Sequence, residues 1–186
     1  MSAPITFYDI GLRPPAAKNC CSPNPWKTRF ALNFKALAHT TKWVALPDIV
    51  NLRTTLQVAP TRKFADGSDF FTLPIIEDAS TGTTLGDSLD IALTTVGFPF
   101  DPANEAATKA IFVDRARPYM TAWEDFALRG DDRARMLASY ADFIVGAWLR
   151  MFDVTLPAEE WQQVRGWHGG VFGRLHDGLQ AYAEVK

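Results

Sequence analysis

The segment Ser22–Arg29 combines the residue types from which a binding site for an anion can be built. Ser22 and Asn24 are good helix caps, and Pro25 suits the first turn of the helix that we predict over residues 25–35. The start of a helix offers unpaired backbone N–H groups and the positive end of the helix dipole. A hydroxyl at that place can add a hydrogen bond to a bound anion. Taken alone, the segment favours an ordinary capped helix, and an anion site is the alternative that the rest of the chain has to support.

Two adjacent cysteines, Cys20 and Cys21, precede this helix and offer a different chemistry. A cysteine at a helix N-terminus is acidic and forms mixed disulfides, which would make Cys21 the nucleophile of a thiol transferase. Neighbouring cysteines cannot form a long-range disulfide, and this usage is typical of a reducing compartment, so we expect the cytosol. The two cysteines and three histidines show no spacing of metal ligands, and no metal is expected.

Composition and charge limit the classes of partner. The chain has 186 residues, a formal net charge of −2, and 47% hydrophobic against 22% charged residues. It contains no long basic run, so neither nucleic acid nor a membrane surface is an expected partner. No apolar run reaches the length of a bilayer span, and the N-terminus lacks the pattern of a signal peptide. These properties are those of an ordinary globular protein.

Strand and helix signals alternate over residues 1–96, which we predict to be one domain. The periodicity predicts a strand at 5–8, a helix at 25–35, a second strand at 41–46 and a second helix at 49–57. A hairpin at 71–85 and a helix from 86 to 91 follow. Pro74 is unusual, because a proline at a strand head is tolerated only at an edge or at the first position. Asp87 and Ser88 are predicted caps of the helix that follows the hairpin.

The composition changes after residues 97–102, which we predict to be a linker. Strand signals end there, and residues 103–186 are predicted to form an all-helical domain. A capping box at Ser139–Asp142 precedes the apolar run 143–149, which predicts a helix buried nearly all round. Another helix is predicted from residue 156, with a break at Trp167–Gly170 before the last helix at 172–183.

Taken in this order, the segments resemble a glutathione transferase, and the finer resemblance is to the fungal etherase-like branch, which is related to bacterial β-aryl etherases. The segments that carry it span nearly the whole chain: Ser22–Arg29, Trp43–Ile49, Leu73–Ile75, Ser80–Gly82, Asp87–Leu89, Ser139–Phe143 and Trp167–Gly170. The resemblance implies an α/β thioredoxin-like N-terminal domain that binds glutathione, followed by an all-α C-terminal domain. Only about 40 residues separate the linker from Ser139. The family has two long helices there, which form a wall of the acceptor pocket and much of the dimer contact, so the helical domain is expected to be shortened.

The resemblance also implies how the backbone and the hairpin end would hold the tripeptide. Pro74 is expected to be cis, which leaves the backbone of Leu73 to pair with the cysteinyl backbone of glutathione. Ser88 and the N–H groups of its helix would hold the γ-glutamyl carboxylate, and Asp87 would pair with the ammonium group. Lys63 is a candidate for the glycyl carboxylate, with an exposed loop lysine as the alternative.

Ser22 is then the expected donor to the glutathione sulfur, with Asn24 as a secondary donor. The leading hypothesis is a glutathione transferase whose thiolate attacks a hydrophobic or aromatic electrophile, with aryl-ether cleavage as one candidate reaction and a homodimer as one candidate assembly. Two alternatives stay open. One is a non-catalytic protein that binds glutathione or an aromatic ligand, and the other is a thiol transferase that uses Cys21.

Overall fold

The computed structural model of the chain describes residues 4–11, 21–95 and 140–186. The predicted linker at 97–102, the predicted helix from residue 103 and the predicted cap at Ser139 lie outside the described residues. The domain bounds 1–96 and 103–186 therefore stay predictions.

A mixed sheet forms the centre of the N-terminal half. Its strands are β1 (Ile5–Ile10), β2 (His39–Val44), β5 (Ile75–Asp78) and β6 (Thr83–Gly86), in the order β2–β1–β5–β6 across the sheet. Strands β1 and β2 are parallel, whereas β5 is antiparallel to both β1 and β6. The strands and the hairpin predicted from the sequence are confirmed. The second strand, β2, ends earlier than predicted, because Leu46 and Pro47 belong to a short 3-10 helix, η2 (Leu46–Asp48).

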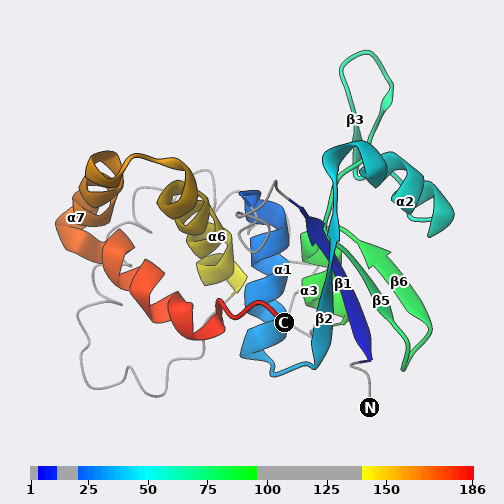
Figure 1. Ribbon diagram of the computed structural model, residues 1–186, viewed down its shortest axis with the longest axis horizontal. Coiled ribbons are helices and arrows are strands. Elements are labelled where there is room, and N and C mark those ends of the chain that lie inside the picture. The colour runs from blue at the N-terminus through cyan, green and yellow to red at the C-terminus, as the bar shows by residue number, and fades with distance from the viewer. Residues whose placement is uncertain (1–3, 12–20, 96–139) are drawn as a thin grey trace, which may run out of the picture.

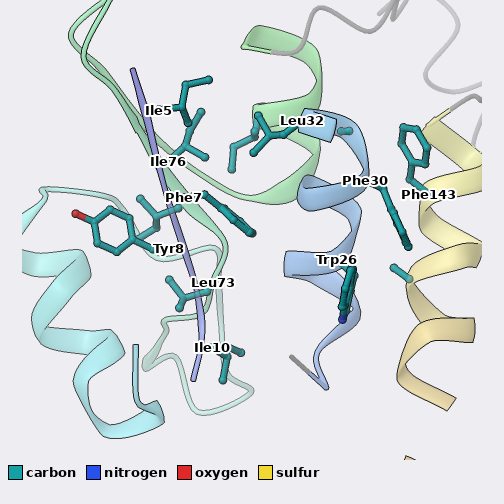
Figure 2. Close-up of a cluster of buried hydrophobic side chains, with 14 of the residues drawn as sticks. Ile5, Phe7, Tyr8, Ile10, Trp26, Phe30, Leu32, Leu73, Ile76 and Phe143 are labelled. Atoms are coloured by element: carbon teal, nitrogen blue, oxygen red, sulfur yellow. The ribbon is translucent and has the colours of Figure 1, made fainter. Parts of the chain in front are cut away.

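Helices cover both faces of this sheet (Figure 1). The helices α1 (Pro23–Phe34) and α3 (Ser88–Thr94) lie on one face, and α2 (Ile49–Thr55) lies on the other, as Figure 2 also shows. Because both faces are covered, consecutive residues of β1 can be apolar. Phe7 points toward α1 and Tyr8 points toward α2, and both side chains are buried (Figure 2).

A small hairpin projects from the end of the sheet near α2 (Figure 1). Its strands are β3 (Arg62–Lys63) and β4 (Asp69–Phe70), which pair antiparallel. Gly67 at its tip has φ 85°, a conformation that glycine adopts readily. The two short strands on either side of the turn were not predicted.

The C-terminal half consists of α6 (Tyr140–Thr155), α7 (Ala158–Leu179) and the short 3-10 helix η4 (Gln180–Tyr182). Four residues inside α7, at 167–170, have non-helical angles, which confirms the predicted break. The prediction that α6 is buried nearly all round is wrong on one side, because Trp148 is 46% exposed. A helix that packs against two neighbours, here α1 and α7, still leaves a face for solvent. None of the described helices is long and apolar enough to cross a bilayer.

Aromatic side chains join the helical half to the N-terminal half. The centre of the Phe143 ring of α6 lies 6.0 Å from that of Phe30 and 5.6 Å from that of Phe34, both on α1. Figure 2 shows Phe143 facing Phe30. Further along the two helices, the Arg150 guanidinium lies 5.1 Å from the centre of the Trp26 ring. These pairs show that α6 runs antiparallel to α1, so the later turns of α6 lie beside the first turns of α1.

His39, at the start of β2, predicts a pH dependence of stability. The side chain is buried, its Nδ1 lies 3.0 Å from the Leu37 carbonyl oxygen, and its Nε2 has no hydrogen-bond partner among the described residues. Burial lowers the pKa of His39, because the charged imidazolium loses its hydration. Between the folded pKa and the unfolded value of about 6.5, the unfolded state binds more protons. The unfolding free energy should therefore fall as the pH drops below about 6.5.

Urea unfolding at about pH 7 and about pH 5 measures this effect. The variant His39→Phe should lose much of the difference between the two pH values. The exposed His168 provides the matched control, because His168→Asn suits the positive φ of that position and should keep the pH dependence of the wild type. An unchanged pH dependence in His39→Phe would contradict the prediction.

Candidate functional site

The strand register brings the predicted parts of the site to one edge of the sheet. Tyr8 pairs with Ile75, so Pro74 lies beside the carboxyl end of β1. Ile75 also pairs with Gly86, so Asp87 follows on the other side, and its N–H donates to the Pro74 carbonyl oxygen at 3.3 Å. The chain enters α1 at the same edge, as Figure 2 shows from the positions of Ile10, Leu73 and Trp26.

The Leu73–Pro74 peptide bond is cis, as predicted. Both side chains are buried, so a ligand at this edge can meet only the backbone of Leu73. The Leu73 carbonyl oxygen accepts a weak hydrogen bond from the Thr72 hydroxyl at 3.3 Å. In the part of the chain that the structure describes, the Leu73 N–H has no backbone partner. This segment has the form of an edge to which an extended peptide can pair.

Ser22 occupies the N-cap position of α1, with extended backbone angles. Among the described residues, its side chain makes no hydrogen bond that caps the helix, so the simple capping function that the sequence offered is not what this serine performs. Asn24 lies within the first turn, and its Oδ1 accepts a hydrogen bond from the Lys27 ammonium at 2.8 Å. Both predicted donors are thus placed at the start of α1.

Asp87 caps α3, as predicted. Its carboxylate accepts a hydrogen bond from the Leu89 N–H at 2.8 Å, while its backbone has φ 91°. A residue other than glycine in this conformation costs about 1–3 kcal/mol, and such strain is concentrated at functional sites. Ser88 follows at the first position of α3, and its side chain is buried. The turn is therefore held in an unfavourable conformation beside Pro74.

Lys63 is not brought together with these residues. It lies on the projecting β3–β4 hairpin, where its side chain is 66% exposed and forms an ion pair of 2.8 Å with Asp69 (Figure 1). Its ammonium group also lies 3.4 Å from the Gly67 carbonyl oxygen, within the same hairpin. A contact with the glycyl carboxylate stays a prediction.

Two cations at the site were missed by the sequence analysis. Lys27 is half-buried in α1, and burial lowers its pKa, while the charge of Asp87 acts in the opposite direction. Arg53 of α2 is 1% exposed, and burial lowers its pKa too, again opposed by the charge of Asp87. The Arg53 guanidinium donates to the carbonyl oxygens of Thr72 and Ala59. Nothing in the local sequence of α2 distinguishes Arg53 from an exposed arginine.

A cavity of about 320 Å³ adjoins Asp87 on the side of the sheet that carries α2. Arg53, Gly86, Asp87 and Asp90 are among the residues that line it. A Cβ atom added at Gly86 would lie 2.8 Å from Nη2 of Arg53, so the strand and the guanidinium are in close contact. The cavity therefore places one buried cation and two carboxylates next to the strained turn.

A buried ion pair holds α1 on the sheet. Arg29 of α1 and Asp9 of β1 are 2.6 Å apart, and both side chains are fully buried. Arg29 also donates to the Thr41 hydroxyl of β2 at 3.0 Å. The helix that carries Ser22 is thus attached to both parallel strands by a single guanidinium.

Cys21 directly precedes Ser22, is half-buried and has a free thiol. Cys20 lies outside the described residues. Within 4–11, 21–95 and 140–186, no group of three or more His, Cys, Asp or Glu side chains is arranged to hold a metal ion.

Comparison with known proteins identifies both halves of the chain. The family model for the glutathione S-transferase N-terminal domain matches residues 21–94, and the model for the glutathione S-transferase C-terminal domain matches residues 113–182. Glutathione S-transferase-like protein ustS of Aspergillus flavus is 33% identical over 95 residues, which are 48% of this chain and 33% of that protein. The match thus spans about a third of the length of that curated relative.

Solved structures agree with the fold over whole chains. Glutathione transferase GSTFuA2 of Phanerochaete chrysosporium has a TM-score of 0.80 and 23% identity, with 100% of both chains covered. A glutathione S-transferase of Ceriporiopsis subvermispora, solved in complex with glutathione, has a TM-score of 0.72 and 25% identity over 98% of each chain. Because the N-terminal and C-terminal domain models of one family match the chain in order, the chain belongs to the glutathione S-transferase superfamily.

Proposed function

We propose that this chain is a glutathione transferase that activates the glutathione thiol for attack on a hydrophobic or aromatic electrophile. The observation that carries the proposal is the meeting of three segments at one sheet edge: the start of α1, the cis Leu73–Pro74 bond and the strained turn at Asp87. The related Ceriporiopsis protein was solved with glutathione bound, which supports the choice of ligand.

In this proposal the tripeptide pairs along the backbone of Leu73, and its γ-glutamyl end lies at Asp87 and Ser88. Its sulfur then lies at the start of α1, where Ser22 donates a hydrogen bond. The thiolate attacks an electrophilic carbon, the new C–S bond forms, and a halide or aryloxide leaves with the bonding electrons. The thiol proton passes to solvent. Aryl-ether cleavage is the case in which the leaving group is an aryloxide, and a reducing cytosol would supply reduced glutathione.

Binding and turnover can be tested separately. We expect the chain to be retained on immobilised glutathione, to be released by free glutathione, and to conjugate an aryl halide faster than the uncatalysed reaction. A model aryl ether tests the finer reaction with the same sample. Retention without turnover on any electrophile would favour the non-catalytic binder, and the absence of retention would contradict glutathione binding itself.

Cys21 supports the competing thiol-transferase function, because it is a free thiol next to the N-cap of α1. Mass spectrometry after treatment with glutathione disulfide distinguishes the two chemistries. The proposed function predicts that Cys21→Ala keeps aryl-halide conjugation. A stable glutathione adduct on Cys21, together with loss of activity in Cys21→Ala, would instead establish redox chemistry.

A further inference from the structure

Arg53 of α2 is a buried cation that is held by backbone groups. The residue is 1% exposed, and in the part of the chain that the structure describes it forms no ion pair within 4.0 Å. Its guanidinium donates instead to the carbonyl oxygens of Thr72 and Ala59. Burying a cation without a carboxylate is costly, and an apolar side chain of similar size would fill the same place without that cost. The two carbonyl contacts are therefore the feature that calls for a function.

The guanidinium lies among three segments that meet at the proposed site. Ala59 follows α2, Thr72 precedes the cis Leu73–Pro74 bond, and Gly86 ends β6. A Cβ atom added at Gly86 would lie 2.8 Å from Nη2 of Arg53, so strand β6 leaves the guanidinium no free space on that side. A planar guanidinium carries several N–H donors in fixed directions and can hold both carbonyl groups at once. The Thr72 carbonyl group is thus fixed by a side chain that is itself fixed.

The peptide group between Thr72 and Leu73 connects this contact to the proposed ligand. The bond is trans, since the cis bond is the next one along the chain. In a planar trans peptide the C=O and the N–H point in opposite directions, so the Leu73 N–H points away from Arg53. Among the described residues, that N–H has no backbone partner. A cation bound to the carbonyl oxygen also polarises the peptide group, which strengthens its N–H as a donor.

We propose, on the basis of the proposed function, that Arg53 is a positioning residue for glutathione: by binding the Thr72 carbonyl oxygen, it directs the Leu73 N–H toward the cysteinyl carbonyl oxygen of the tripeptide. Arg53 does not touch the ligand in this arrangement. Its effect on binding is therefore confined to one hydrogen bond in the middle of the tripeptide. The γ-glutamyl and glycyl ends do not contribute to it.

Calorimetric titration with two ligands measures this hydrogen bond without involving the thiol. One ligand is S-methylglutathione. The other is its analogue with a trans alkene in place of the amide between the cysteinyl and glycyl residues, which keeps the extended shape but has no carbonyl oxygen. The wild-type chain should bind the alkene about 3- to 10-fold more weakly. In Arg53→Met, S-methylglutathione should bind about 3- to 10-fold more weakly, and the change to the alkene should then cost less than about 2-fold.

Three further variants separate positioning from folding. Arg53→Lys keeps a charge that reaches one carbonyl group but lacks the fixed fork for two, so it should recover part of the difference between the two ligands. Gly86→Ala keeps the arginine and places a methyl group against its guanidinium, so it should reduce that difference, and it carries the test if Arg53→Met does not fold. The matched control is Arg62→Met, which changes an exposed arginine of the β3–β4 hairpin and should bind both ligands as the wild type does.

The outcomes distinguish this assignment from the proposed function. If Arg53→Met and Gly86→Ala weakened both ligands by one factor, or weakened neither, the positioning function would be wrong and glutathione binding would stand. Equal binding of the two ligands by the wild-type chain would show that the Leu73 N–H is not the donor, which overturns the assignment as well. If the wild-type chain bound no S-methylglutathione, the proposed function would fail, and the assignment with it.

Discussion

Replacing Ser22 with alanine is expected to raise the pKa of the bound glutathione thiol by about one to two units and to slow conjugation near pH 7 about 3- to 30-fold, because the wild-type thiol is already largely ionised at that pH. A thiol with a pKa of about 8.5 is only about 3% ionised at pH 7. A hydrogen bond to a charged group stabilises it by about 1.5–3 kcal/mol, which corresponds to one to two pKa units. The dipole of α1 adds about 0.3–2 kcal/mol and remains in the variant, so activity should fall without vanishing.

The pH dependence of the conjugation rate shows whether a raised thiol pKa is the cause of the lower activity. The rate of Ser22→Ala should rise with pH through the raised pKa and approach the wild-type rate in alkaline solution, because the thiolate then forms without the hydroxyl. The thiolate absorbance of bound glutathione, followed against pH, measures the pKa directly. Ser68→Ala, in the tip of the exposed β3–β4 hairpin, is the matched control and should leave both readouts unchanged. Equal thiol ionisation in Ser22→Ala and the wild type would show that another group activates the sulfur.

The sequence predicted the parts of the site that depend on close neighbours in the chain. Pro74 stands at the head of an apolar strand, and Asp87 lies between a strand run and a helix start, so local rules were sufficient to single out both. Their meeting at one edge depends on the register in which Tyr8, Ile75 and Gly86 pair. Local patterns do not contain that register, and only the family resemblance supplied it.

The burial of charged side chains is the part of the site that the neighbouring sequence does not indicate. Arg53 lies between Leu52 and Thr54 in a short helix of mixed apolar and polar residues, so its neighbours in the sequence do not indicate a buried side chain. The fold nevertheless buries it against Gly86 and the chain beside Pro74. Lys63 is the opposite case, because an unpredicted hairpin carries it into solvent. Burial of a charge is decided by the elements that pack around it. A short stretch of sequence therefore identifies a charged residue but does not predict whether its side chain is buried or exposed.

The buried pair Asp9–Arg29 has the largest expected effect on stability. Arg29→Met should lower the unfolding free energy by about 3–5 kcal/mol, because it leaves the carboxylate of Asp9 buried without its cation. Urea unfolding followed by circular dichroism measures the change. Arg165→Met is the matched control, since Arg165 and Asp177 also form an Arg–Asp pair, 2.7 Å apart, but are 27% and 58% exposed. There the expected loss is about 0–1 kcal/mol, because solvent screens the pair.

A double variant separates the ion pair from the packing of the arginine. In Asp9→Leu with Arg29→Met no charge is left buried, so the double variant should be more stable than Arg29→Met alone. The guanidinium, however, also lies 4.9 Å from the centre of the Phe7 ring and 5.4 Å from that of Trp26. If those cation–π contacts were the main contribution, restoring neutrality would recover nothing, and the double variant would be at least as unstable as the single one. A gain in the double variant would therefore assign the stability to charge pairing, and with it the attachment of α1 to the sheet.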